Sequence, residues 1–147
     1  MRHTLRIGLL SVVGSMLVVG TLGVGTVAAK GAPTLMPRPD TKLVGGELIH
    51  LQGDNWPADD GNLVAWECDS SAHPTSAAYC DNATAVAVGS NGKGKLKYSA
   101  FTVTTGAVGD GMCGTDSADK VCYIAVYDMV DPAVHGVGKI VFEVPAT

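Results

Sequence analysis

The chain has 147 residues and a formal net charge of −4, from 14 acidic and 10 basic side chains. An acidic surface repels phosphate backbones, so the composition argues against tight binding of nucleic acid by the fold itself. Beyond the N-terminal segment, the length is that of one ordinary domain.

The first 29 residues have the pattern of a secretory signal peptide. A basic start with Arg2, His3 and Arg6 precedes an apolar run over residues 7–24 that contains no charged side chain, and small residues fill positions 27–29. A transmembrane anchor is the alternative, because the run is near the lower length limit for a span. We expect cleavage, secretion to the exterior or cell envelope, and no stable membrane span afterwards.

Cleavage after residue 29 would leave residues 30–147 as the mature domain. Arg2 and Arg6 leave with the signal, so 14 acidic and 8 basic side chains remain and the net charge becomes −6. The basic cluster at Lys93, Lys95 and Lys97 is expected on one face of a strand, because alternate strand residues share a face.

Short β-prone runs separated by turn residues follow along the chain, and no helical periodicity appears. A tight turn is expected at Asn91-Gly92 and a glycine-rich loop over 104–111, and residues 136–138 are expected to precede the last strand. Trp56 is expected to be a buried lid at one end. The pattern is typical of an all-β sandwich of about seven strands. The predicted strands are 33–36, 47–52, 63–66, 83–88, 95–103, 121–127 and 139–144.

The four cysteines form two local groups, Cys68 with Cys80 and Cys113 with Cys122, each beside a β-prone run. In an exported chain of this size, such spacing indicates two disulfides that close short loops. Four cysteines allow three pairings, so spacing alone favours the local pairs without excluding the others.

Several short motifs occur in a distinctive order along the chain. They are Ala32-Pro33-Thr34, a corner and strand from Gly53 to Cys68, the Asn91-Gly92 turn, a strand from Cys122 to Asp128, and a final segment from Gly136 to Phe142. In this order they resemble the neocarzinostatin family of secreted apoproteins that carry enediyne chromophores. The resemblance spans nearly the whole chain after the signal.

The resemblance implies a seven-stranded antiparallel immunoglobulin-like sandwich with disulfides Cys68–Cys80 and Cys113–Cys122. It implies a cleft between the larger barrel and a smaller ribbon region, which holds a small apolar or aromatic molecule non-covalently. In such carriers the released chromophore cuts DNA, so an antibiotic or antimicrobial role and a DNA-binding label would both belong to the ligand.

The chain departs from the family pattern at the positions expected to face the cleft. Trp66 stands where the family has glycine, Glu67 follows where glutamine is frequent, and aromatic rings alternate in the strand after Cys122. The rings could stack on a flat ligand, or they could fill the cleft and leave no room. For Asp128, a turn-capping role is the alternative to ligand contact. The candidate ligand-binding residues are Trp66, Tyr123, Ala125, Tyr127 and Asp128.

Catalysis and metal binding have little support. His50, His73 and His135 accompany no nucleophile-and-base spacing, and the histidines and cysteines lack zinc-type spacing. We therefore expect a monomeric, non-enzymatic binding protein without a metal cofactor, whose partner is a small molecule. An extracellular interaction domain that keeps the sandwich and binds no chromophore is the alternative.

Overall fold

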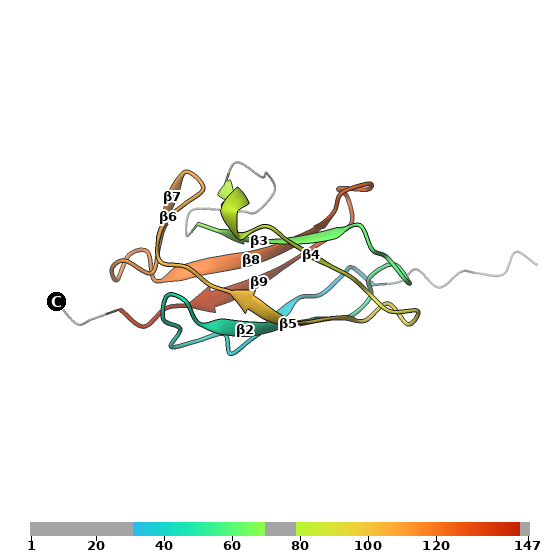
Figure 1. Ribbon diagram of the computed structural model, residues 1–147, viewed down its shortest axis with the longest axis horizontal. Helices are drawn as coiled ribbons and strands as arrows, with labels where there is room; N and C mark the ends of the chain where they lie inside the picture. Colours follow the sequence, from blue (N-terminus) through green and yellow to red (C-terminus); the bar gives the residue numbers. More distant parts are fainter. Residues whose placement is uncertain (1–30, 70–78, 145–147) are drawn as a thin grey trace, which may run out of the picture.

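The structure is a computed structural model that describes residues 31–69 and 79–144, and it is an all-β sandwich of two facing antiparallel sheets (Figure 1). One sheet has the order β1-β2-β5 and the other β4-β3-β8-β9. The predicted fold class is confirmed. The strands are β1 (Met36–Arg38), β2 (Leu48–Gly53), β3 (Leu63–Cys68), β4 (Val86–Val88), β5 (Leu96–Thr102), β6 (Gly106–Val108), β7 (Gly111–Cys113), β8 (Val121–Asp128) and β9 (His135–Val141).

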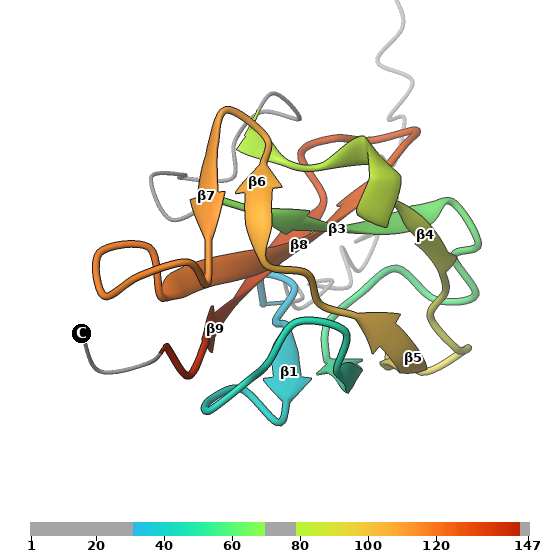
Figure 2. The same cartoon turned by 60° about the vertical axis from the view of Figure 1, so that its left-hand side comes forward.

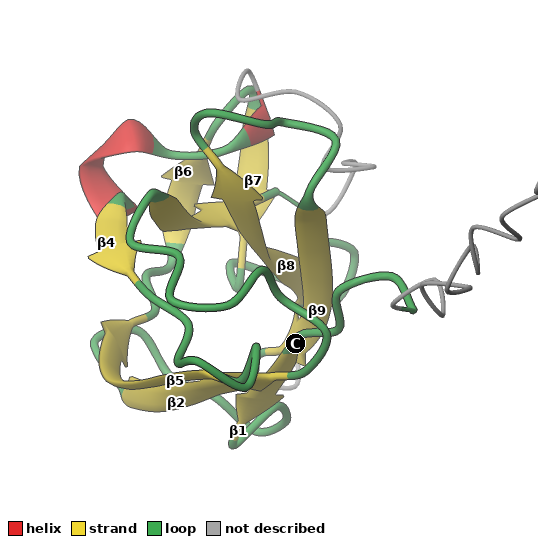
Figure 3. Cartoon of the chain, turned by 90° about the vertical axis from the view of Figure 1, so that its right-hand side faces the viewer, coloured by secondary structure: helices red, strands yellow, loops and turns green. Residues whose placement is uncertain are grey.

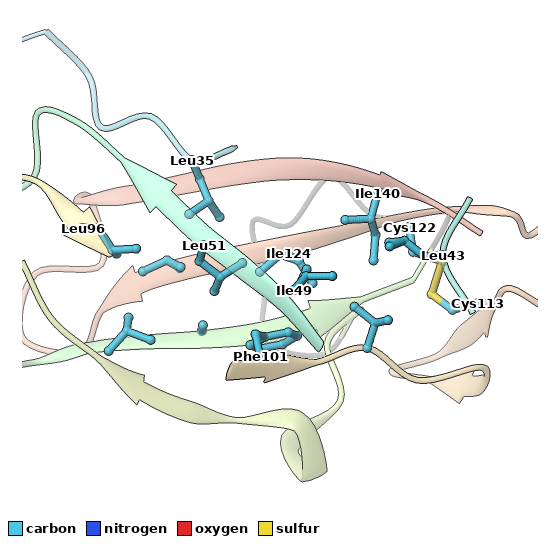
Figure 4. Close-up of a cluster of buried hydrophobic side chains, with 14 of the residues drawn as sticks. Leu35, Leu43, Ile49, Leu51, Leu96, Phe101, Cys113, Cys122, Ile124 and Ile140 are labelled. Carbon is cyan, nitrogen blue, oxygen red and sulfur yellow. A yellow bond between two sulfur atoms is a disulfide. The ribbon is translucent and has the colours of Figure 1, made fainter. Parts of the chain in front are cut away.

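The core lies between the two sheets, where alternate residues of each strand meet (Figure 4). In β2, Ile49 and Leu51 are fully buried while the intervening His50 is exposed. In β8 the core face carries Ile124 and Val126. This period-two burial follows from the pleat, which sends successive side chains to opposite faces. Seen from one end, β2 and β5 form one layer, and β8 and β9 belong to the other (Figure 3).

Both local disulfides are formed, and the implied pairing is confirmed. Cys68 is bonded to Cys80, twelve residues on, and Cys113 to Cys122, nine residues on. Loops of this size reduce the entropy of the unfolded chain by an amount worth roughly 2–3 kcal/mol each in the chain-entropy model.

A hairpin of β6 and β7 occupies the segment that was expected to be a glycine-rich loop. It pairs Gly106 with Cys113 and Val108 with Gly111, and Gly109 at its tip has a positive φ of 57°. Glycine adopts this backbone conformation without steric cost, so here the glycines permit a tight hairpin. Figure 2 shows this hairpin rising at one end of the sandwich. We call β6 and β7 the ribbon.

The first and last strands begin away from their predicted positions. β1 includes Pro37, which is tolerated because β1 is an edge strand that pairs only with β2. β9 begins at His135, so the glycines expected to precede the strand lie inside it. A Cβ on Gly138 would lie 2.3 Å from Cδ of Pro37, so this glycine allows β9 to pack closely against β1.

The segment before β4 also differs from the predicted strand. Asn82–Thr84 forms one 3₁₀ turn, labelled η2, and the Asp81 carboxylate accepts a hydrogen bond from the Ala83 N–H at its start. This cap satisfies a backbone donor and favours the turn over an extended strand. β4 is therefore limited to Val86–Val88.

The predicted turn at Asn91-Gly92 is present, but it connects the two sheets. β4 pairs with β3 while β5 pairs with β2, and the positive φ belongs to Gly94. The three nearby lysines therefore do not share one strand face. Lys97 lies in β5, whereas Lys95 precedes the strand and forms an ion pair with Asp54 at 2.6 Å.

Trp56 is fully buried, as predicted, and its Nε1–H donates a hydrogen bond to the Thr34 carbonyl at 3.0 Å. In the described ranges, no helix is long and apolar enough to cross a membrane. The predicted signal segment lies outside the described residues.

Candidate functional site

The outer face of the four-stranded sheet, turned away from the core, carries a second cluster of apolar side chains. In β8, the residues between the core positions are Tyr123, Ala125 and Tyr127, as the sequence pattern predicts. Antiparallel pairing with β3 places Trp66 opposite Ala125. We call this surface the aromatic face. Its residues are Val64, Trp66, Tyr123, Ala125, Tyr127, His135 and Val137.

Three rings form a continuous row across the aromatic face. The Trp66 and Tyr127 ring centroids are 5.9 Å apart in an edge-to-face arrangement, with an interplanar angle of 63°. Tyr127 stacks on His135 with centroids 5.4 Å apart at 26°. Both separations lie in the range where aromatic pairs attract each other. The row therefore runs from a nearly buried indole, 8% exposed, to an exposed imidazole.

The hydroxyl of Tyr127 is buried and has no hydrogen-bond partner in the part of the chain that the structure describes. Burial raises the pKa of Tyr127 above its ordinary value, so the phenol stays protonated at physiological pH. A buried hydroxyl without a partner is costly, and it would gain one from a bound molecule only after the side chains that cover it move aside.

Asp128, the fifth candidate residue, does not join the aromatic face. It lies on the opposite side of β8, is 8% exposed, and its Oδ1 accepts a hydrogen bond from the Val130 N–H at 2.8 Å. This geometry is that of a turn cap at the end of β8. We therefore leave Asp128 out of the proposed contact set.

The Cys68–Cys80 disulfide closes one end of the aromatic face. Both cysteines are buried in the same cluster as Trp66 and Ala125. The ribbon packs behind this disulfide: the Cys113 Sγ lies 3.5 Å from the Cys68 carbonyl oxygen. The end of the face is thus built from β3, the disulfide and the ribbon together.

Glu67 is a buried acid whose side chain lies on the core side of β3, opposite the aromatic face, and sequence reasoning assigned it no role. It lies on β3 between Trp66 and Cys68, is 0% exposed, and its Oε2 accepts hydrogen bonds from the Thr104 N–H and Oγ1–H at 2.7 and 3.0 Å. Burial raises the pKa of Glu67 to about 7. The only sequence signal was a charged residue within a run that is otherwise apolar.

His135 is the other residue that sequence reasoning missed. Its place beside Tyr127 depends on the pairing of β8 with β9, which sequence spacing alone does not supply. His50 is exposed on β2, which belongs to the other sheet and not to the one that carries the aromatic face. His73 lies outside the described residues. Among the residues that the structure describes, no group of three or more His, Cys, Asp or Glu side chains could hold a metal ion.

Comparisons with known proteins give a match in structure alone. No family model matches the sequence, and no curated protein matches it. A solved structure of macromomycin matches with a TM-score of 0.53 and 19% sequence identity, over 76% of this chain and 100% of that one. At this identity the likeness concerns the fold. The chain therefore has a macromomycin-like, and hence neocarzinostatin-like, fold.

Proposed function

We propose that this protein is a secreted, non-enzymatic carrier that binds a small apolar or aromatic molecule on the aromatic face. The observation that carries the proposal is the composition of that face. The outer side of an antiparallel sheet is ordinarily polar, because one face of such a sheet packs on the core and the other meets water. Here it carries a row of three rings, and the buried Tyr127 hydroxyl in that row has no hydrogen-bond partner among the described residues.

The chemistry of the face favours a flat ligand with at least one polar group. Trp66, Tyr127 and His135 supply ring surfaces, and each ring offers a large contact area with few torsions to freeze. The buried Tyr127 hydroxyl would supply a hydrogen bond if ligand binding moved aside the side chains that cover it. Enediyne-like chromophores are one such class, and the resemblance noted in the sequence favours them. We propose that any antibiotic effect and any DNA damage belong to the bound molecule.

Secretion and a monomeric state complete the proposal. Two disulfides persist in oxidising compartments, and residues 1–29 have the pattern of a cleaved signal. No catalytic group is assigned, and the function needs none.

A second candidate is an extracellular interaction domain that binds no chromophore. The burial of Trp66 favours it. The indole is 8% exposed and packed with Ala125, so little of its ring surface is left for a ligand. In this case the rings stabilise the sheet and bind nothing.

A dye titration distinguishes the two functions. The mature protein is titrated with flat hydrophobic dyes while Trp fluorescence and dye emission are followed, and Trp66→Phe is compared with wild type. Trp56 also fluoresces, so the signal that disappears in Trp66→Phe reports the aromatic face. The carrier function predicts saturable binding that weakens in the variant. Absence of binding by a folded wild-type protein would favour the interaction domain.

A further inference from the structure

Glu67 lies in β3 between two residues of the aromatic-face cluster, and its side chain points to the other side of the strand, where it binds the segment before the ribbon. Its neighbours in β3 are Trp66, on the face, and Cys68, in the disulfide. Its Oε2 holds Thr104, two residues before the ribbon begins, through both the backbone N–H and the hydroxyl. Its Oε1 is buried and has no hydrogen-bond partner in the described part of the chain.

The ribbon is also fitted closely against the disulfide. A Cβ on Gly109 would lie 2.3 Å from the carbonyl carbon of Tyr79 and 2.8 Å from the backbone nitrogen of Cys80. The Cys113 Sγ approaches the Cys68 carbonyl oxygen at 3.5 Å. A change in the strength of the Glu67–Thr104 hydrogen bonds should therefore change how closely the ribbon packs against the Cys68–Cys80 disulfide, which closes one end of the aromatic face.

Burial, helped by one nearby carboxylate, makes the ionised form of Glu67 costly. Burial is the largest effect, the two Thr104 hydrogen bonds oppose it, and the Asp81 carboxylate beside η2 adds repulsion. Asp69, two residues on, is a second buried acid and packs against Gly111 of the ribbon. From β8, the residue opposite Glu67 is the uncharged Ile124.

We propose that the Glu67–Thr104 contact is a proton-operated latch that sets how firmly the ribbon closes the end of the aromatic face, and so how tightly the face holds its ligand. Neutral Glu67 is compatible with burial, and the ribbon stays closed. Ionised Glu67 gains solvation only when the ribbon opens and water reaches the carboxylate. Rising pH therefore favours opening. The ligand part of this inference rests on the proposed carrier function, whereas the ribbon part does not.

The pH range of opening follows from proton linkage. While the ribbon is closed, the Glu67 carboxyl keeps its proton up to about pH 7. When the ribbon is open and the carboxyl is solvated, it loses the proton near pH 4.5. The opening equilibrium should thus increase by up to about tenfold per pH unit between these values and level off above pH 7.

Amide hydrogen exchange on the mature protein tests the ribbon part. Protection of residues 104–113 is measured from pH 4.5 to 8.5 and corrected for the pH dependence of intrinsic exchange. We expect protection to fall as pH rises to about 7 in wild type and to be independent of pH in Glu67→Gln, which keeps an acceptor for Thr104. Glu47→Gln, at a half-buried acid that accepts from the Val44 N–H, is the matched control and should behave like wild type.

A second variant keeps the test decisive if Glu67→Gln does not fold. Thr104→Val removes one hydrogen bond to the carboxylate, so the pH at which protection levels off should move upward. Protection that is independent of pH in wild type, or equally dependent on pH in Glu67→Gln, would overturn the latch. If the ribbon opens with rising pH but the dye affinity stays constant, the proposed effect of the latch on ligand binding is wrong. If no dye binds, the carrier function fails and the exchange data alone decide on the latch.

Discussion

Trp66 on β3 lies directly opposite Ala125 on β8, and both side chains are buried in one cluster on the outer face of the sheet. The largest side chain of the face is thus paired across the strands with a single methyl group. A small partner leaves space for an indole on a pleated surface, where opposite Cβ atoms lie about 4.5–5.5 Å apart.

Ala125→Leu should therefore destabilise the fold. The added methylene groups compete with the indole of Trp66 for the same space, and such overpacking costs about 1–3 kcal/mol. Urea denaturation followed by circular dichroism measures the loss. Ala107→Leu, at an exposed alanine in β6, is the matched control and should change stability by less than about 0.5 kcal/mol. Equal effects of the two substitutions would show that Trp66 and Ala125 are not packed together as described.

Tyr127→Ala should weaken an aromatic ligand by roughly 1–3 kcal/mol, because the ring lies between Trp66 and His135 and its burial is lost. Tyr127→Phe keeps the ring and removes the hydroxyl, so it separates stacking from hydrogen bonding. Dye titrations and thermal melts are run in parallel, with the exposed Leu48→Ala on the other sheet as control.

The interaction-domain alternative makes the opposite prediction for this residue. If the rings only fill the face, wild type binds no dye, and Tyr127→Ala loses stability and gains a cavity where the ring was. Binding that appears only in the variant would contradict the carrier function.

Stability should decrease as pH rises through the range set by Glu67. Burial raises its pKa from an ordinary 4.5 to about 7, so the folded state binds the proton more tightly than the unfolded state. The resulting stabilisation is fully present below about pH 4.5 and is lost as pH rises to about 7, by up to about 3 kcal/mol. Denaturation at pH 5 and pH 8 measures this difference. It should shrink in Glu67→Gln, and an unchanged difference in that variant would assign the pH dependence to other groups.

The purified protein should not bind duplex DNA appreciably. Its acidic charge opposes the phosphates, and Lys95 is already paired with Asp54. An electrophoretic mobility assay at low micromolar protein in about 150 mM salt should show no shift. A shift under these conditions, with ligand-free protein, would contradict the assignment of any DNA activity to a bound molecule.

Much of the fold was predictable because period-two burial and turn residues are local signals. β2, β3, β5 and β8 lie close to their predicted positions, and the alternation in β8 correctly placed Tyr123, Ala125 and Tyr127 on one face. The cysteine spacing favoured the local pairing that the structure contains.

The features that sequence did not predict depend on contacts between distant segments. β9 extends through Gly136 and Gly138 because those glycines pack against Trp56 and Pro37, residues about eighty and one hundred positions earlier. The same holds for the candidate site. His135 and Glu67 gain their roles from the register of β8 with β9 and from the position of Thr104, and neither relationship is visible in residue spacing.

Native mass spectrometry of the protein purified from its own host tests the carrier function most directly. The account predicts a species with the mass of a chain that begins near residue 30, with both disulfides formed, together with a second species heavier by one small molecule. Organic extraction should remove the extra mass, and the extract should restore it to wild type but restore it poorly to Tyr127→Ala. A folded, disulfide-bonded protein that carries no extra mass under gentle conditions, from producing cultures, would contradict the proposed function.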